Sequence, residues 1–159
     1  MQGLSFAISI LVSNCYGKKD FAGVNAYVKR GYLMILCTSV FLSLMLYLFR
    51  NQAVGLFTDS PEVAKIAVSL FFVLFAYQLG DGIQLCFANV LRGLQDVKPI
   101  MYAAFVSYYI IAIPVAYVLG FKFGLGAVGV WIGFPVGLSL AGLFFFLRYR
   151  SDMRKFRRF

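Results

Sequence analysis

One acidic residue stands alone in a long apolar segment of the chain. Residues 66–91 read IAVSLFFVLFAYQLGDGIQLCFANVL, and Asp81 is the only charged residue among them. A carboxylate near the middle of a membrane costs about 2.5–3.5 kcal/mol on insertion scales, so one that is retained there usually has a function. Tyr77 precedes Asp81 by four residues, so a helix places both side chains on one face. These two oxygen ligands predict a site for a small cation such as Na⁺, or for a proton, completed by another helix.

Other roles are open for the same side chains. The Asp81 carboxylate could instead tie helices together by hydrogen bonds or cap a broken helix, and Tyr77 taken alone fits packing nearly as well as ligation. Gly80 and Gly82 flank Asp81 and predict a bend or local unwinding, which would free backbone carbonyls beside the carboxylate. Interhelical hydrogen bonds are expected of two further polar side chains in this segment, Gln78 and Asn89.

The composition is that of an integral membrane protein. Of the 159 residues 62% are apolar, against about 45–50% in globular proteins. Histidine is absent, and the three cysteines are scattered without a CxxC motif. The sequence holds no nucleophile–base pair, phosphate-binding loop or metal cluster, so we expect neither an enzyme nor a cofactor, and no metal beyond Na⁺ at Asp81. The net charge of +9 resides in short loops and a tail, which indicates membrane topology rather than nucleic-acid binding.

The apolar segments predict an all-α fold with four full transmembrane helices and one partial helix. A spanning helix needs about 20 residues. We expect full spans at residues 31–49, 62–92, 99–121 and 123–147. Residues 1–14 are apolar but too short, which favours the second half of a helix whose first half is missing, and hence a fragment. The alternative is a short re-entrant or interfacial segment.

Proline and glycine predict local features in the last two spans. Pro114 lies inside residues 99–121 and should kink that helix, as a candidate moving part. Gly129, Gly133 and Gly137 form a GxxxGxxxG pattern, whose flat face allows close helix packing. We expect this face to pack inside one bundle, although it also fits a dimer.

The basic residues predict the orientation of the chain in the membrane. Residues 15–30, 92–98 and the basic tail 148–159 hold twelve Lys and Arg on one side, whereas residues 50–65 and Lys122 contribute three on the other. The positive-inside rule places the first side, with the C-terminus, in the cytoplasm.

In their order and spacing, these segments resemble the C-terminal part of a MATE (multidrug and toxic compound extrusion) transporter. The opening GLSFAISILVSNCYGKKD is similar to the family's eighth helix, G-x-S-x-A-x-x-x-x-V-G-N-x-x-G-x-x-D, with Ser13 in place of glycine. FTDSPEV resembles the loop before the tenth helix. NVLRGLQDVKPIMY resembles the turn into the eleventh, with Gln95 and Val97 replacing a glycine and a threonine.

The resemblance implies a fold of two six-helix lobes, of which this chain is most of the second. It implies antiport in the bacterial plasma (inner) membrane, with export of cationic or amphipathic compounds driven by Na⁺ or H⁺. In the NorM-like branch, a tyrosine and an aspartate of the tenth helix help bind the coupling cation, and Tyr77 and Asp81 match them. That branch also uses a glutamate of the seventh helix, which this chain lacks. The implied partners are the lipid bilayer, the missing N-terminal lobe and a small amphipathic cationic substrate.

Two other functions stay open. A related flippase that moves a lipid-linked sugar shares the two-lobe plan and would be favoured by basic residues lining a cleft. Here the basic residues lie at the membrane edges. The second alternative is a non-transporting, truncated remnant that only packs against partners, which the short first span favours.

Overall fold

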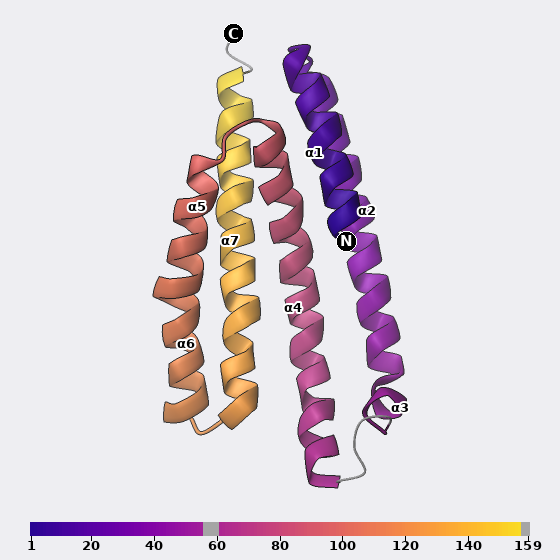
Figure 1. Cartoon of the computed structure of the whole chain (residues 1–159), viewed down its shortest axis with the longest axis vertical. Helices are drawn as coiled ribbons and strands as arrows, with labels where there is room; N and C mark the ends of the chain where they lie inside the picture. The colour runs from indigo at the N-terminus through magenta and orange to yellow at the C-terminus, as the bar shows by residue number, and fades with distance from the viewer. Residues whose placement is uncertain (56–60, 157–159) are drawn as a thin grey trace.

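The computed structural model describes residues 1–55 and 61–156, and all regular structure among them is helical (Figure 1). Four residues of the FTDSPEV motif, 57–60, lie outside this described part. The all-α prediction is confirmed. In chain order, the elements are α1 (Gln2–Gly17), α2 (Phe21–Leu48), α3 (Arg50–Gly55), α4 (Pro61–Gly93), α5 (Lys98–Phe105), the π-helix η1 (Val106–Ala112), α6 (Ile113–Tyr117), the π-helix η2 (Val118–Lys122) and α7 (Gly126–Phe156).

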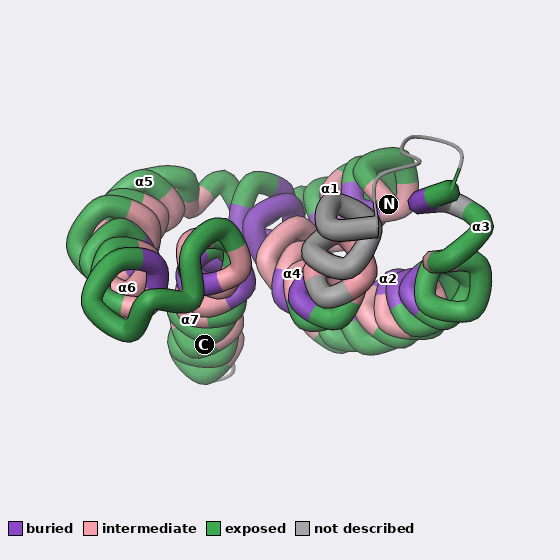
Figure 2. Tube along the Cα trace, turned by 90° about the horizontal axis from the view of Figure 1, so that it is seen from below, coloured by how far each residue is buried: buried purple, intermediate pink, exposed green. Residues whose placement is uncertain are grey.

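Four helical segments are long and apolar enough to cross a membrane. They are Phe21–Leu48, Leu70–Gly93, Lys98–Lys122 and Gly126–Phe156. In the bundle, α4 packs against α1, α2 and α7, whereas the segment from α5 to η2 packs chiefly on the far side of α7 (Figure 2). The helix α1 starts at about mid-height and covers only one half of its neighbours (Figure 1).

The turns divide the bundle into two ends. The α1–α2 turn, the α4–α5 turn and the C-terminal end of α7 lie together, and we call this the basic end (Figure 1). The helix α3 and the turn between η2 and α7 lie at the opposite end. Asp20 caps α2 at the basic end by accepting a hydrogen bond from the backbone N–H of Gly23, at 2.9 Å.

The helix α7 extends farther toward the basic end than the sequence led us to expect. It continues to Phe156, so part of the tail 148–159 is helical. The apolar span was expected to end at residue 147. Burial of the Tyr149 ring and the stacking of Phe156 on Phe21 on the face that meets the rest of the bundle support this extension of α7.

The helix α4 is α-helical without a break from Pro61 to Gly93, so the local unwinding predicted around Asp81 is wrong. The two flanking glycines serve close packing. A Cβ atom on Gly80 would lie 2.9 Å from Oγ of Ser139 on α7, and one on Gly82 would lie 2.7 Å from Oγ of Ser39 on α2. Glycine lets α4 approach both neighbours here, and packing against them supports the helix.

The helix that contains Pro114 is irregular. A proline inside an α-helix clashes with the carbonyl four residues earlier. Here the preceding turns form η1, where the N–H of Ile113 bonds to the carbonyl of Tyr108, five residues back. The wider π-helical turn makes room for the proline ring. Beyond it, the second π-helix, η2, ends where the N–H of Phe123 bonds to the carbonyl of Val118, at 3.0 Å.

The three glycines of the GxxxGxxxG pattern lie where α7 meets this irregular helix. Added Cβ atoms on Gly133 and Gly137 would stand 2.6 and 2.8 Å from the Cβ atoms of Ala116 and Ala112. Small residues on both sides therefore allow the two helices to approach closely.

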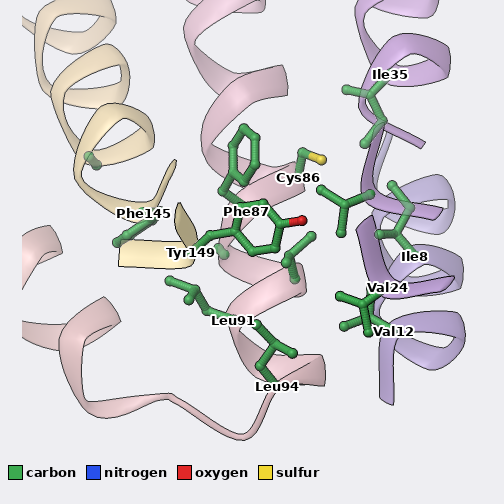
Figure 3. Packing of buried hydrophobic residues seen from close by; sticks show 14 residues of the cluster. Ile8, Val12, Val24, Ile35, Cys86, Phe87, Leu91, Leu94, Phe145 and Tyr149 are labelled. Carbon is green, nitrogen blue, oxygen red and sulfur yellow. The ribbon is translucent and has the colours of Figure 1, made fainter. Parts of the chain in front are cut away.

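The buried core occupies the half of the bundle next to the basic end (Figure 3). It is built by α1, the first half of α2, the second half of α4 and α7. The ring of Phe87 lies at its centre, with ring centroids of Phe146 and Tyr149 at 5.1 and 5.9 Å. The core residues are Ile8, Val12, Val24, Val28, Ile35, Cys86, Phe87, Ala88, Val90, Leu91, Leu94, Ala141, Phe145 and Tyr149.

Candidate functional site

Asp81 lies on α4 just beyond the edge of the buried core. Its side chain is half-buried, as is that of Tyr77 one turn earlier on the same helix. The phenol of Tyr77 lies within electrostatic reach of the Asp81 carboxylate. The structure therefore brings together the two residues that the sequence paired, on an apolar helix whose backbone is fully helical.

A second phenol, which the sequence reasoning missed, comes from the neighbouring span. Tyr108 on η1 also lies within electrostatic reach of both Asp81 and Tyr77. The amide of Gln84 on α4 lies near the Tyr108 hydroxyl. A signal for Gln84 was available, because Tyr77, Asp81 and Gln84 follow one another at helical spacing as a polar stripe on an apolar helix. No comparable pattern marks Tyr108, whose place depends on how η1 packs.

The other polar residues around α4 join helices. Asn89 is 2% exposed and donates to Oγ of Ser5 on α1 at 3.0 Å. Its carboxamide oxygen accepts a bond from Arg92 at 3.2 Å. Gln78 contacts the sulfur of Met1 at 3.7 Å, and the hydroxyl of Ser39 contacts the same sulfur at 3.8 Å. The interhelical role expected for Asn89 is confirmed, and Gln78 also reaches across to a neighbouring segment.

The group around Asp81 supplies one carboxylate, two phenols and one amide. This set suits a proton or a hard monovalent cation, which prefers oxygen ligands. In the described part of the chain, no group of three or more His, Cys, Asp or Glu side chains could hold a metal ion. Since α4 is unbroken, its carbonyls stay within the helix, and further ligands would have to come from elsewhere.

Comparison with known proteins places this geometry in context. The family model described as MatE matches residues 1–118 of the chain. The chain is 36% identical over 153 residues to the probable multidrug resistance protein NorM of Bacillus subtilis, covering 96% of the chain and 34% of that protein. It is 32% identical over 151 residues to the multidrug resistance protein NorM of Photobacterium profundum, covering 92% of the chain and 33% of that protein.

Solved structures share the arrangement of helices. The eukaryotic MATE transporter AtDTX14 matches with a TM-score of 0.86 and 24% identity over 99% of this chain and 36% of its own. An inward-facing multidrug resistance MATE family transporter of the MOP superfamily matches with a TM-score of 0.86 and 16% identity, over 97% and 36%. The chain thus spans about a third of the length of the proteins that it matches.

Proposed function

Because the chain belongs to the MatE family, we propose that it forms part of an antiporter that exports cationic or amphipathic compounds in exchange for Na⁺ or H⁺. The family match confirms the resemblance to MATE transporters. The four apolar spans of the chain indicate an integral membrane protein. Its relatives carry the name multidrug resistance protein, which supports drug-like substrates. The function is transport rather than catalysis of a chemical reaction.

The orientation is part of the proposal. The basic end carries most of the Lys and Arg residues, and the positive-inside rule places such an end in the cytoplasm. For a relative of bacterial NorM proteins, the membrane would be the plasma (inner) membrane. Substrate would then leave from the basic end toward the opposite end.

The single observation that carries the coupling proposal is the position of Asp81. It lies half-buried in an apolar, unbroken helix, within reach of Tyr77 and Tyr108 from two different spans. Binding of a cation or proton would neutralise the carboxylate and favour closer packing of η1 against α4. Substrate would favour the arrangement in which η1 packs less closely against α4. Binding of the substrate would then expel the cation or proton, and binding of the cation or proton would expel the substrate.

The moving part in this proposal is the span that contains Pro114. It packs on α7 through small residues, and its π-helical turns interrupt the α-helical hydrogen-bonding pattern near Tyr108. Gly80 and Gly82 are less suited to this role, since α4 is continuous and both glycines lie against neighbouring helices. We therefore assign the gating role to the region of Pro114.

The test is efflux of a fluorescent cationic dye by the full-length polypeptide that contains this chain, reconstituted into vesicles with Na⁺ or without it. We expect Asp81→Asn to abolish coupled efflux while the protein remains in the membrane. Loss of wild-type efflux in Na⁺-free buffer would identify Na⁺ as the coupling ion, and efflux sustained by a proton gradient would identify H⁺. Wild-type export by the mutant would contradict the role of Asp81.

A matched tyrosine pair tests the added ligand. Tyr108→Phe should weaken coupling, because it removes the hydroxyl near Asp81, whereas Tyr109→Phe changes a neighbouring side chain that is exposed. Equal effects of the two substitutions would remove Tyr108 from the site. An absence of dye efflux from the wild-type protein would instead favour the lipid-linked sugar flippase or the remnant.

A further inference from the structure

A groove on the surface of the bundle, separate from Asp81, has the shape and polarity of a lipid site. It has a volume of about 630 Å³ and lies between α2 and α7, with α4 as its floor. Figure 2 shows α4 set back between these two helices. Its wall is formed chiefly by the apolar side chains Val28, Tyr32, Ile83, Phe87, Leu143 and Phe146.

Two polar side chains of the groove, Asn25 and Lys29, lie toward its basic end, whereas Ser139 lies at the other end of the lining. Asn25 and Lys29 lie one turn apart on α2, so both side chains project from one face of that helix. The hydroxyl of Tyr149 on α7 donates to the carboxamide oxygen of Asn25 at 2.6 Å. Because the oxygen of Asn25 is engaged, its amide N–H groups are left to donate to a ligand. The mouth of the groove therefore presents an ammonium group and an amide donor.

The charge of Lys29 is not balanced locally. Among the side chains that the structure describes, both ion pairs involve Arg148, which pairs with Asp96 and Asp152. Lys29 is exposed and has no carboxylate partner among these described side chains. A cation at a membrane surface attracts anionic lipid headgroups.

The length of the groove fits one leaflet of a bilayer. Its lining residues on α7 run from Ser139 to Tyr149, which is about 15 Å at about 1.5 Å per residue. The hydrocarbon core of a bilayer is about 30 Å thick, so the apolar wall is about as long as one leaflet. An acyl chain would lie along this wall with its headgroup at Lys29.

From this combination, we propose that the α2–α4–α7 groove binds an anionic glycerophospholipid of the leaflet at the basic end. Its phosphate lies at Lys29 and Asn25, and one acyl chain lies along Phe87, Leu143 and Phe146. A transmembrane helix from elsewhere in the polypeptide fits less well, because it would cover the ammonium group of Lys29 with apolar side chains. The site does not depend on the coupling role of Asp81.

The experiment measures lipid binding by native mass spectrometry of the detergent-purified full-length polypeptide. Phosphatidylglycerol and phosphatidylcholine with identical acyl chains are the two probes. We expect tighter binding of phosphatidylglycerol, and Lys29→Gln should weaken it about fivefold, the contribution of one lysine near a charged lipid surface. Lys29→Arg should retain the preference. Lys18→Gln, an exposed lysine of the α1–α2 turn outside the groove, should leave it unchanged.

The apolar wall is tested separately. Leu143→Trp should displace both lipids by filling the groove, whereas Phe144→Trp, at the adjacent exposed position, should not. Because an overfilled variant can misfold, Leu143→Cys labelled with a maleimide after purification fills the groove of an already folded protein. The wild-type protein labelled in the same way controls for the native cysteines.

Three results would overturn the proposal. Equal binding of the two lipids with no effect of Lys29→Gln would exclude a headgroup site. Equal losses for Lys29→Gln and Lys18→Gln would indicate diffuse attraction to the basic end. A cross-link from a photoreactive residue at position 143 to another part of the polypeptide, with no lipid bound, would mean that protein covers the groove.

Discussion

The half of the bundle next to the basic end and the half next to the opposite end are packed very differently. The first contains the fourteen-residue core around Phe87. In the second, the last turns of α2 carry a run of large apolar side chains that stay exposed, from Val40 to Phe49 except for Ser43. The helix α1 contributes to this difference, because it covers α2 and α4 only on the side of the basic end (Figure 1).

The polar ties between helices follow the same division. Arg148 on α7 bonds to Asp96 in the α4–α5 turn at 2.6 Å, and Asn89 on α4 bonds to Ser5 on α1 at 3.0 Å. Both contacts lie toward the basic end. Asp81 lies where this tied region gives way to the half in which the last turns of α2 stay exposed. A change in its charge would therefore move the ends of helices near the opposite end more easily than the core.

The largest difference between the halves should appear when a large apolar side chain is removed. Phe145 on α7 is 1% exposed, whereas Phe72 on α4 is 73% exposed. Phe145→Ala leaves a cavity, and we expect a loss of about 3 kcal/mol in the free energy of unfolding, the low end of the range for soluble cores. Phe72→Ala should change it by less than about 0.5 kcal/mol.

Chemical unfolding in detergent micelles measures both variants. Detergent chains solvate apolar side chains as lipid does, so the cost of Phe145→Ala must come from lost packing. Similar unfolding free energies for the two variants would mean that the two halves are equally well packed.

A matched pair of glycines gives the next largest effect. A Cβ atom on Gly93 would lie 2.7 Å from the backbone oxygen of Ser9 and 3.0 Å from Cγ1 of Val12, so Gly93→Ala should push α1 away from α4. We expect a loss of about 1–3 kcal/mol, as for other overpacked sites. Gly55 in α3 has no atom of the described residues within 4 Å of such a Cβ, so Gly55→Ala should be neutral or slightly stabilising.

Thermal unfolding of both variants in the same detergent checks this pair. An unfolding temperature for Gly93→Ala equal to that of Gly55→Ala would show that α1 is loosely attached. The tied half of the bundle would then consist of α2, α4 and α7 alone.

Much of the fold was predictable because the membrane leaves few choices. Apolar runs of sufficient length must form helices there, and the charges between them mark the turns. The end of the last helix was not predictable from apolar length alone. The tail residues Tyr149, Asp152 and Phe156 follow one another at helical spacing. They belong to a helix because the turns of α1, α2 and α4 happen to meet them, as in the stacking of Phe156 on Phe21 at 4.8 Å.

The candidate site was predictable within one helix and not between helices. The spacing of Tyr77 and Asp81 is fixed by helical geometry, and the structure retains it. Tyr108 joins them only through the packing of η1, which the local sequence does not specify. The unwinding predicted at Gly80 and Gly82 failed for a related reason. Glycine at these positions is explained by close neighbours on α7 and α2, which lie far away in sequence.

The smallest effect should come from the ion pair that ties α7 to the α4–α5 turn. Its side chains are 37% exposed for Arg148 and 27% for Asp96, so solvent screens the attraction. Asp96→Asn removes the charge while Arg148 keeps its contact with Asp152 at 3.4 Å. We expect a loss of about 0.2–1 kcal/mol in the free energy of unfolding, typical of exposed pairs.

Salt separates this contribution from packing. Raising the NaCl concentration should shrink the difference between wild type and Asp96→Asn, because screening weakens the pair in the wild type. The loss in free energy of unfolding from Phe145→Ala should stay constant over the same range.

Arg50→Gln is the matching variant near the opposite end. It removes a cation that lies 4.2 Å from the centre of the Tyr47 ring. That contact lies within one stretch of chain, so its loss should not separate helices. Asp96→Asn could instead lower the free energy of unfolding as much as Phe145→Ala at every salt concentration. The contact between Arg148 and Asp96 would then be structural rather than electrostatic. The basic end would in that case depend more on a few polar contacts than on its core.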